Sequence, residues 1–436
     1  MPTRPQESLP RLLKVLTCLR DLKCLMDTTP SALPEATQRF DTIDVLRGFS
    51  ILAVVLLHTW LRLFMAGYDI RRPAFPPMLA HLIFFNGGNG VTVFFTISGF
   101  LITLTSLRRF GSLSAVKAST FYRIRFARIA PLLALIVALL SVLALLHAPG
   151  FQFEARSAPL WRAVIAAFTF HLNWLEARFW FLPANWNVMW SLSVEEMFYL
   201  FFPIFCVALL RFRKGMIPFI AILLAFVAMG PFARTVWSSN EIWLEESYLG
   251  GMDGIALGCI AALLTQHLAT RQAGLWTAAH RRALLLVQWI GAILLVVISL
   301  GPSWLWKLNP TKFDFWGTLL SLSACFVMIS SVLRQAGEPS RSPGLITAPI
   351  RWYGRHSYEI YLTHEFIVIC GVLLFTHWHP NTTPGKDGLA QHQLDLLHMA
   401  MWTMGIVLLT APLGWLTATF FSEPMNRRLR GAKPPR

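Results

Sequence analysis

The chain has 436 residues, of which 55% are hydrophobic and 14% charged, and its formal net charge is +16. Soluble domains carry about 25% charged residues, so this composition excludes an ordinary soluble enzyme. The basic residues cluster between apolar runs, which is the charge pattern of a membrane protein, and so we expect no nucleic-acid partner.

Apolar runs of about 20 residues recur along the whole chain, which predicts an all-α, polytopic membrane helix bundle. We expect ten transmembrane helices, at 45–65, 89–107, 129–147, 191–210, 216–236, 248–268, 283–301, 313–333, 357–376 and 399–421. The segment 161–175 is apolar but short for a crossing, and we expect it to be re-entrant or interfacial.

The basic residues predict the orientation of these helices. Of the 38 Lys and Arg residues, 28 fall in the segments 1–47, 108–128, 211–215, 269–282, 334–355 and 427–436. The positive-inside rule then places both termini in the cytoplasm. We expect a basic amphipathic extension at 1–40, a membrane domain at 41–425 and a basic cytoplasmic tail at 426–436. The six cysteines lack metal-ligand spacing, which predicts free thiols.

The first helix carries three ionisable residues on one face. At 100° per residue, Arg47 lies about 20° and Asp44 about 40° from His58 around the helix. His58 lies about 16 Å along the axis from Arg47. A histidine at that depth either makes a hydrogen bond to a neighbouring helix for packing, or it acts as a general base near neutral pH. The residues alone leave both interpretations open.

The second helix and the loop after it differ in character. Gly87, Gly88, Gly90 and Gly99 predict close helix packing. The loop "LRRFGSLSAVKASTFYRIRFARIAP" carries Arg123, Arg125 and Arg128 at the start of the third helix. These arginines serve either as a topology signal or as phosphate ligands, since guanidinium groups bind phosphate in a bidentate manner.

The stretch "WSLSVEEMFYL" places two carboxylates at the start of the fourth helix, between aromatic residues. Glu195 and Tyr199 share a face at i, i+4, and Trp190 suits a membrane interface. Glu196 points 100° away, so we expect one glutamate to face a polar cavity and the other to cap the helix or pair with an arginine. In the later helices, Asp253 lies among glycines, and His364 shares a face with Ser357 and Tyr361.

Six ordered motifs give the chain a family resemblance. It resembles the acyltransferase-3 family of integral membrane O-acyltransferases through the segments "IDVLRGFSILAVVLLH", "VFFTISGFLI", "FYRIRFARIAP", "WSLSVEEMFYLFFP", "MDGIALG" and "GRHSYEIYLTH". The resemblance covers about residues 39–425. It implies transfer of an acyl group, often acetyl, from acyl-CoA to a hydroxyl, in the bacterial inner membrane, and no metal is expected.

The resemblance also implies roles for individual residues. His58, Glu195 and His364 would be catalytic; Arg47, Arg123, Arg125 and Arg128 would bind the acyl-CoA; Glu196, Trp190, Tyr199 and Asp253 would bind a saccharide, glycan or lipid-linked acceptor on the outer side. Met197 replaces the glutamine that usually follows the two glutamates. The competing hypothesis is a transporter of a polar solute or lipid-linked sugar, in which buried carboxylates and histidines relay protons.

Overall fold

The computed structural model describes residues 40–68, 77–212, 214–236, 239–271, 277–301, 314–335, 344–379 and 396–431. Within these ranges all of the regular secondary structure is helical, and ten helices are long and apolar enough to cross a membrane. The predicted all-α bundle with ten spans is confirmed. The predicted extension at 1–40 lies almost entirely outside the described residues. Helix geometry does not test the predicted cytoplasmic position of the termini.

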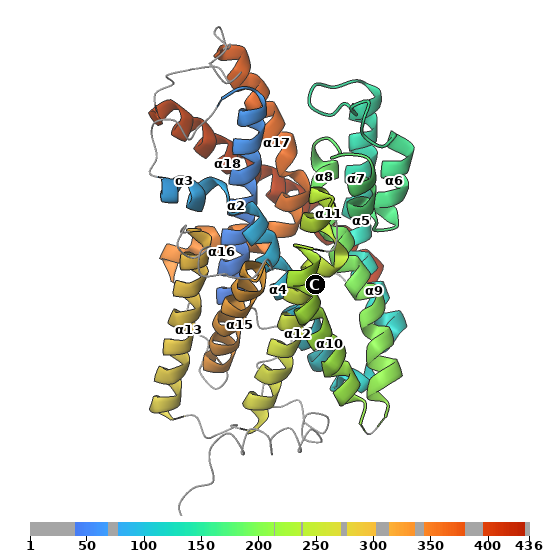
Figure 1. The fold of residues 1–436 in the computed structure, drawn as a ribbon, viewed down its shortest axis with the longest axis vertical. Coiled ribbons are helices and arrows are strands. Elements are labelled where there is room, and N and C mark those ends of the chain that lie inside the picture. Colours follow the sequence, from blue (N-terminus) through green and yellow to red (C-terminus); the bar gives the residue numbers. More distant parts are fainter. Residues whose placement is uncertain are drawn as a thin grey trace, which may run out of the picture.

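The helices follow one another in the order drawn in Figure 1. Their bounds are α2 (Asp41–Met65), α3 (Pro77–Phe84), α4 (Gly87–Phe110), η3 (Leu113–Ala115), α5 (Ala118–Leu145), α6 (Leu160–Phe168), α7 (Leu172–Arg178), α8 (Asn185–Val188), α9 (Trp190–Leu210), α10 (Met216–Ala233), α11 (Glu241–Glu246), α12 (Tyr248–Arg271), α13 (Ala278–Ser299), α15 (Trp316–Gln335), η4 (Leu345–Thr347), α16 (Ala348–Arg355), α17 (Ser357–Trp378), α18 (Leu396–Thr417), the π-helical turn η5 (Ala418–Ser422) and α19 (Glu423–Arg430).

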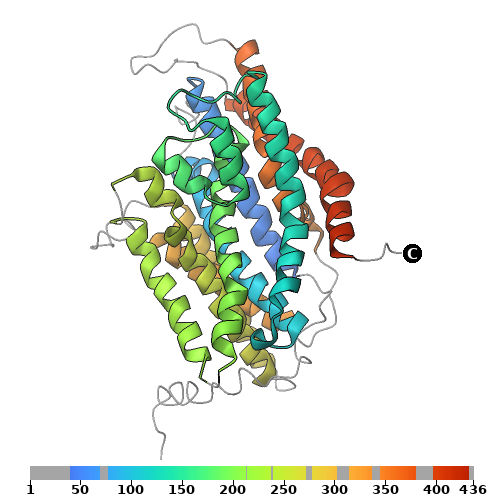
Figure 2. The same ribbon diagram turned by 90° about the vertical axis from the view of Figure 1, so that its right-hand side faces the viewer.

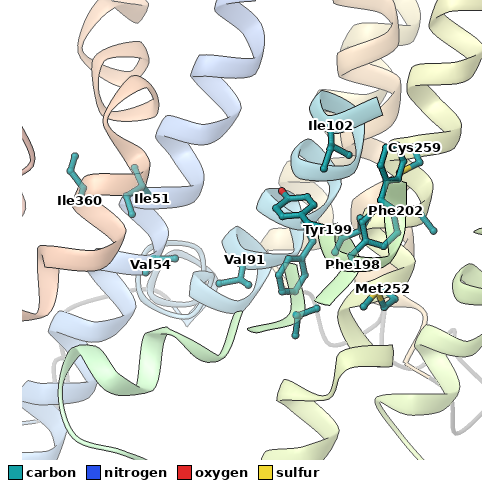
Figure 3. Packing of buried hydrophobic residues seen from close by; sticks show 14 of the residues in the cluster. Ile51, Val54, Val91, Ile102, Phe198, Tyr199, Phe202, Met252, Cys259 and Ile360 are labelled. Carbon is teal, nitrogen blue, oxygen red and sulfur yellow. The ribbon is translucent and has the colours of Figure 1, made fainter. Parts of the chain in front are cut away.

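Helices α4 and α12 form the centre of the bundle and pack closely because glycines line their contact. A Cβ atom on Gly99 would lie 1.9 Å from the carbonyl oxygen of Ile255, and one on Gly258 would lie 2.1 Å from that of Thr96. The predicted close approach is thus confirmed at Gly99. It is wrong for Gly88, where nothing lies within 4 Å. Figure 3 shows the apolar core around these helices, with Ile102, Phe202 and Cys259 side by side.

The segment between α5 and α9 is divided into the short helices α6, α7 and α8, which lie together at one end of the bundle (Figure 2). Segment 161–175 therefore contains no helix long enough to cross, as its length predicts. Cys206, Cys259, Cys325 and Cys370 are free thiols, which confirms that prediction for the described cysteines.

Helix α5 begins eleven residues earlier than the sequence predicts. It spans 28 residues, from Ala118 to Leu145. The predicted start of the third helix at 129 is therefore too late, and Arg123, Arg125 and Arg128 lie well inside α5. As a result, Arg125 and Arg128 are carried alongside α9 and α17, while Arg123 is exposed.

Candidate active site

Two histidines from helices far apart in sequence meet inside the bundle. Helices α2 and α17 lie side by side and run in the same direction, because Arg47 contacts Ser357 and His58 contacts His364. His364 Nε2 lies 3.2 Å from His58 Nδ1. The next residue, Glu365, accepts a hydrogen bond of 3.0 Å from Arg62 Nε, and its other oxygen lies 3.8 Å from His58 Nε2. We call His58, Arg62, His364 and Glu365 the histidine cluster.

Backbone carbonyls indicate which nitrogen carries the proton when each ring is neutral. His58 Nδ1 lies 2.9 Å from the carbonyl oxygen of Val54, and His364 Nδ1 lies 2.8 Å from that of Tyr361. A carbonyl oxygen only accepts, so in each neutral ring the proton resides on Nδ1. His58 Nδ1–H then donates to two acceptors, the carbonyl oxygen of Val54 and Nε2 of His364. The Nε2 lone pair of His58 is left free on the side facing Glu365.

Burial distinguishes the members of the histidine cluster. His364 and Glu365 are fully buried, whereas the side chain of His58 is 14% exposed and that of Arg62 20%. His58 is thus the histidine that another molecule can reach, and the fully buried His364 acts on it through the shared proton. The geometry makes His364 a positioning residue.

The histidine cluster also has the ligand types of a metal site. One ligand atom from each of His58, His364 and Glu365 lies within 4.8 Å of the others, which in the described part of the chain makes them a possible metal-binding group. Arg62 already donates to the Glu365 carboxylate and so opposes a second cation there. Proton transfer with charge compensation is the chemistry that this arrangement supports directly.

A second polar cluster lies nearer the N-terminal ends of the same two helices, α2 and α17. Arg47 Nε donates to Ser357 Oγ at 3.1 Å, and Tyr199 donates to Glu195 Oε2 at 3.3 Å. Arg125 lies 4.1 Å over the Tyr199 ring, and both Arg125 and Arg47 interact electrostatically with Glu195. We call these residues the arginine cluster. Helices α2, α5, α9 and α17 all contribute to it.

The neighbouring ion pairs tie the arginine cluster to the ends of α2 and α18. Arg128 lies 3.3 Å from Glu359, which also accepts a hydrogen bond of 2.7 Å from Ser422. Asp44 pairs with Arg355 at 3.2 Å. Asp44 therefore stabilises the start of α2 and does not reach His58, although the two share a helix face.

One basic residue near the C-terminus was not predicted as a site residue. Arg430, on α19, interacts electrostatically with Arg109, Arg128 and Arg125. Four arginines from α4, α5 and α19 thus lie close to one another. Arg430 belongs to the expected basic tail, and nothing in its spacing relates it to residues 109–128. Only the packing of α19 against α5 reveals it.

The glutamates lie with the arginines. The sequence predicts that one of Glu195 and Glu196 faces a polar cavity and that the other caps the helix or pairs with an arginine, and the family resemblance implies that both border the acceptor on the outer side. The structure brings Glu195 to Arg47 and Arg125 and not to His58, because the longer α5 carries its arginines inward. Glu196 is buried and also interacts with Arg125. Trp190 packs against Phe95 inside the bundle, with ring centroids 6.1 Å apart.

Asp253 holds helices together. Its two oxygens accept hydrogen bonds of 3.0 Å from Arg234, and Thr318 adds one of 2.5 Å. The side chain is 1% exposed. Its carboxylate therefore links α10, α12 and α15, and the geometry gives no support to the predicted contact with an acceptor.

A polar bridge lies between the two clusters. Tyr361 shares a hydrogen bond of 2.6 Å with Ser191 on α9, and its ring centroid lies 6.0 Å from that of His364. On α17, Tyr361 lies one helical turn after Ser357 and about one turn before His364. Polar groups therefore continue along α17 from the arginine cluster to the histidine cluster.

Two curated proteins are similar to the chain over most of its length. The chain is 22% identical to the peptidoglycan O-acetyltransferase OatA of Listeria monocytogenes over 78% of this chain and 51% of that protein. It is 21% identical to the O-acetyltransferase OatA of Staphylococcus aureus over 75% of this chain and 50% of that protein. The chain thus spans about half the length of these curated relatives.

No solved structure matches the chain. A family model described as an acyltransferase domain matches residues 40–419, which include both polar clusters and the whole of α18. The chain belongs to this acyltransferase family.

Proposed function

We propose that this protein is a membrane-embedded O-acyltransferase that moves an acyl group, with acetyl as the expected one, from acyl-CoA to a hydroxyl of a saccharide acceptor. The free Nε2 lone pair of His58, fixed by Val54 and His364, is the observation that carries the proposal. This nitrogen has the properties of a general base or a nucleophile.

The donor would bind at the arginine cluster and the basic residues beneath it. Coenzyme A carries phosphates, and arginine binds phosphate through several parallel hydrogen bonds. Arg109, Arg125 and Arg430 offer three guanidinium groups from three helices. Arg47 lies beyond them on the path to His58, about 16 Å away along α2. The acyl thioester would reach His58 along the Tyr361 bridge.

Two routes are consistent with the position of His58. In the direct route, Nε2 removes the proton from the acceptor hydroxyl, the oxygen attacks the thioester carbonyl, and the C–S bond breaks to release the CoA thiolate. In the relay route, Nε2 attacks the carbonyl first and the C–S bond breaks to release the CoA thiolate. The acceptor oxygen then attacks the acyl-imidazole, the C–N bond breaks, and the hydroxyl proton passes to the released Nε2. In both routes the imidazole passes through a cationic state, which the Glu365 carboxylate 3.8 Å away would stabilise.

The acceptor is proposed from the relatives and from the membrane setting. One relative is named for peptidoglycan, a glycan polymer. We infer a saccharide or lipid-linked glycan at the non-cytoplasmic face of a bacterial inner membrane, with the donor on the cytoplasmic side. The basic residues of the inter-helix segments support this orientation.

The test is acyl transfer by the purified chain in nanodiscs. Radiolabelled acetyl-CoA and a panel of oligosaccharides would be supplied to wild type, to His58→Ala and to the control His398→Ala, whose side chain is exposed on α18. We expect labelled ester from wild type and the control and none from His58→Ala. Label that stays on wild-type protein before acceptor is added would identify the relay route.

Full activity of His58→Ala would contradict the assigned role of His58. Failure of folded wild type to transfer label to any acceptor, together with uptake of an unmodified solute into vesicles, would favour the transporter hypothesis.

A further inference from the structure

A cleft between two short helices at one end of the bundle is unused by the two polar clusters. Helices α7 and α11 lie side by side (Figure 1). Between them is a cavity of about 430 Å³, lined by Trp174, Ala177, Arg178, Asn240 and Trp243. Binding sites for small molecules occupy about 300–1,000 Å³, so the cleft has the size of such a site.

Hydrogen bonds between α7 and α11 hold the two walls of the cleft together. Asn240 Nδ2 donates to the carbonyl oxygen of Ala177 at 2.6 Å, and Asn173 Nδ2 donates to that of Glu246 at 3.0 Å. The Glu176 and Glu246 side chains, one from each wall, are both buried, and Glu176 accepts hydrogen bonds from the Leu182 backbone N–H at 2.8 Å and from Asn187 Nδ2 at 3.2 Å. The cleft is therefore preformed.

The lining has the chemistry of a sugar site. Trp174 is 50% exposed, and Trp174 and Trp243 both line the cleft. Indole rings pack against the C–H face of a pyranose ring. Arg178 adds a planar guanidinium group that hydrogen-bonds to hydroxyls. A tryptophan that only anchored the protein at the membrane interface would not require a second tryptophan and an amide on the facing wall.

The cleft is joined to the helix that carries Glu195. The backbone N–H of Leu172, the first residue of α7, donates to Ser193 Oγ on α9 at 3.3 Å. Helix α11 leads directly into α12, at the centre of the bundle. A ligand held between α7 and α11 is thus bound on elements that pack against the catalytic helices.

We propose that this cleft binds a segment of the glycan acceptor, as a subsite separate from the histidine cluster. The proposal rests on the proposed function, because it takes the acceptor to be a saccharide. It adds the place where sugar units away from the reacting hydroxyl are held, between Trp174 and Trp243, and so predicts that longer oligosaccharides bind more tightly than single sugars.

The experiment measures binding directly, without any acyl transfer. Full-length protein in nanodiscs would be titrated with chitohexaose and with cellohexaose by saturation-transfer NMR and calorimetry. The variants are Trp174→Ala and Arg178→Ala, and Trp161→Ala is the matched control, because Trp161 is an exposed tryptophan on α6 outside the cleft. Thermal unfolding would establish that each variant is folded.

We expect binding of at least one hexasaccharide that weakens about tenfold in Trp174→Ala and in Arg178→Ala and stays unchanged in Trp161→Ala. Absence of binding by wild type, or equal binding by all variants, would overturn the subsite. An equal loss in Trp161→Ala would assign the effect to membrane anchoring and would overturn it too. Loss of acyl transfer with intact hexasaccharide binding would overturn the proposed function and leave the cleft in place.

Discussion

Replacing Glu365 by glutamine tests the charge compensation proposed for His58. The substitution keeps the size of the side chain and removes its negative charge. The carboxylate oxygen lies 3.8 Å from His58 Nε2 and is buried. Two unit charges at that separation attract by about 4 kcal/mol at an effective dielectric constant of about 20. Losing all of it in the transition state would slow turnover roughly 10³-fold.

The expected effect is smaller than this limit, because Arg62 already shares the carboxylate and the His58 side chain is 14% exposed. We therefore expect kcat for acetyl transfer from labelled acetyl-CoA to fall about 10²-fold in Glu365→Gln. The control is Glu154→Gln, which removes a carboxylate from an exposed pair with Arg156. A folded Glu365→Gln enzyme within about threefold of wild-type kcat would refute the idea that an imidazolium forms beside this group.

Three further predictions concern other parts of the molecule. Burial raises the pKa of Glu176 from its ordinary value of 4.5 to about 8, so the folded state binds a proton that the unfolded state has already lost. The free energy of unfolding should therefore fall as pH rises from about 4.5 to about 8. In thermal melts, Glu176→Gln should flatten that pH dependence. Gly99→Ala should destabilise the bundle by about 1–3 kcal/mol or more, because its Cβ would collide with a backbone carbonyl, whereas Gly88→Ala, which meets nothing within 4 Å, should unfold like wild type in a detergent titration. Arg430→Ala should raise KM for acetyl-CoA about tenfold, because it removes a charge-assisted contact to phosphate. The control is Arg211→Ala, at an exposed arginine. Equal KM values for the two variants would count against phosphate binding by Arg430.

The sequence predicted those features that depend on local pattern. Apolar runs of membrane-spanning length determine the ten helices, because backbone hydrogen bonds must be satisfied within each span. Helical periodicity also predicted that Ser357, Tyr361 and His364 share a face. In the structure all three make contacts with other helices, to Arg47, Ser191 and His58 respectively.

Periodicity did not predict the contacts between helices. Asp44 shares a face with His58, and its carboxylate pairs with Arg355 from α16. The family resemblance implied that Asp253 meets an acceptor, and in the structure Arg234, 19 residues before it, donates to both of its oxygens. A periodic pattern shows which way a side chain points and not which helix lies opposite.

The sequence by itself determined the membrane class, the number of spans and the residue types available for acyl transfer, since these follow from hydrophobicity, length and composition. Only the tertiary structure decided that His364 and Glu365 meet His58, that Arg430 joins Arg109 and Arg125, and that Trp174 and Trp243 line the same cleft. The physical reason is that ionisable groups in a membrane protein are stabilised by partners on other helices, and the choice of partner depends on how the helices pack.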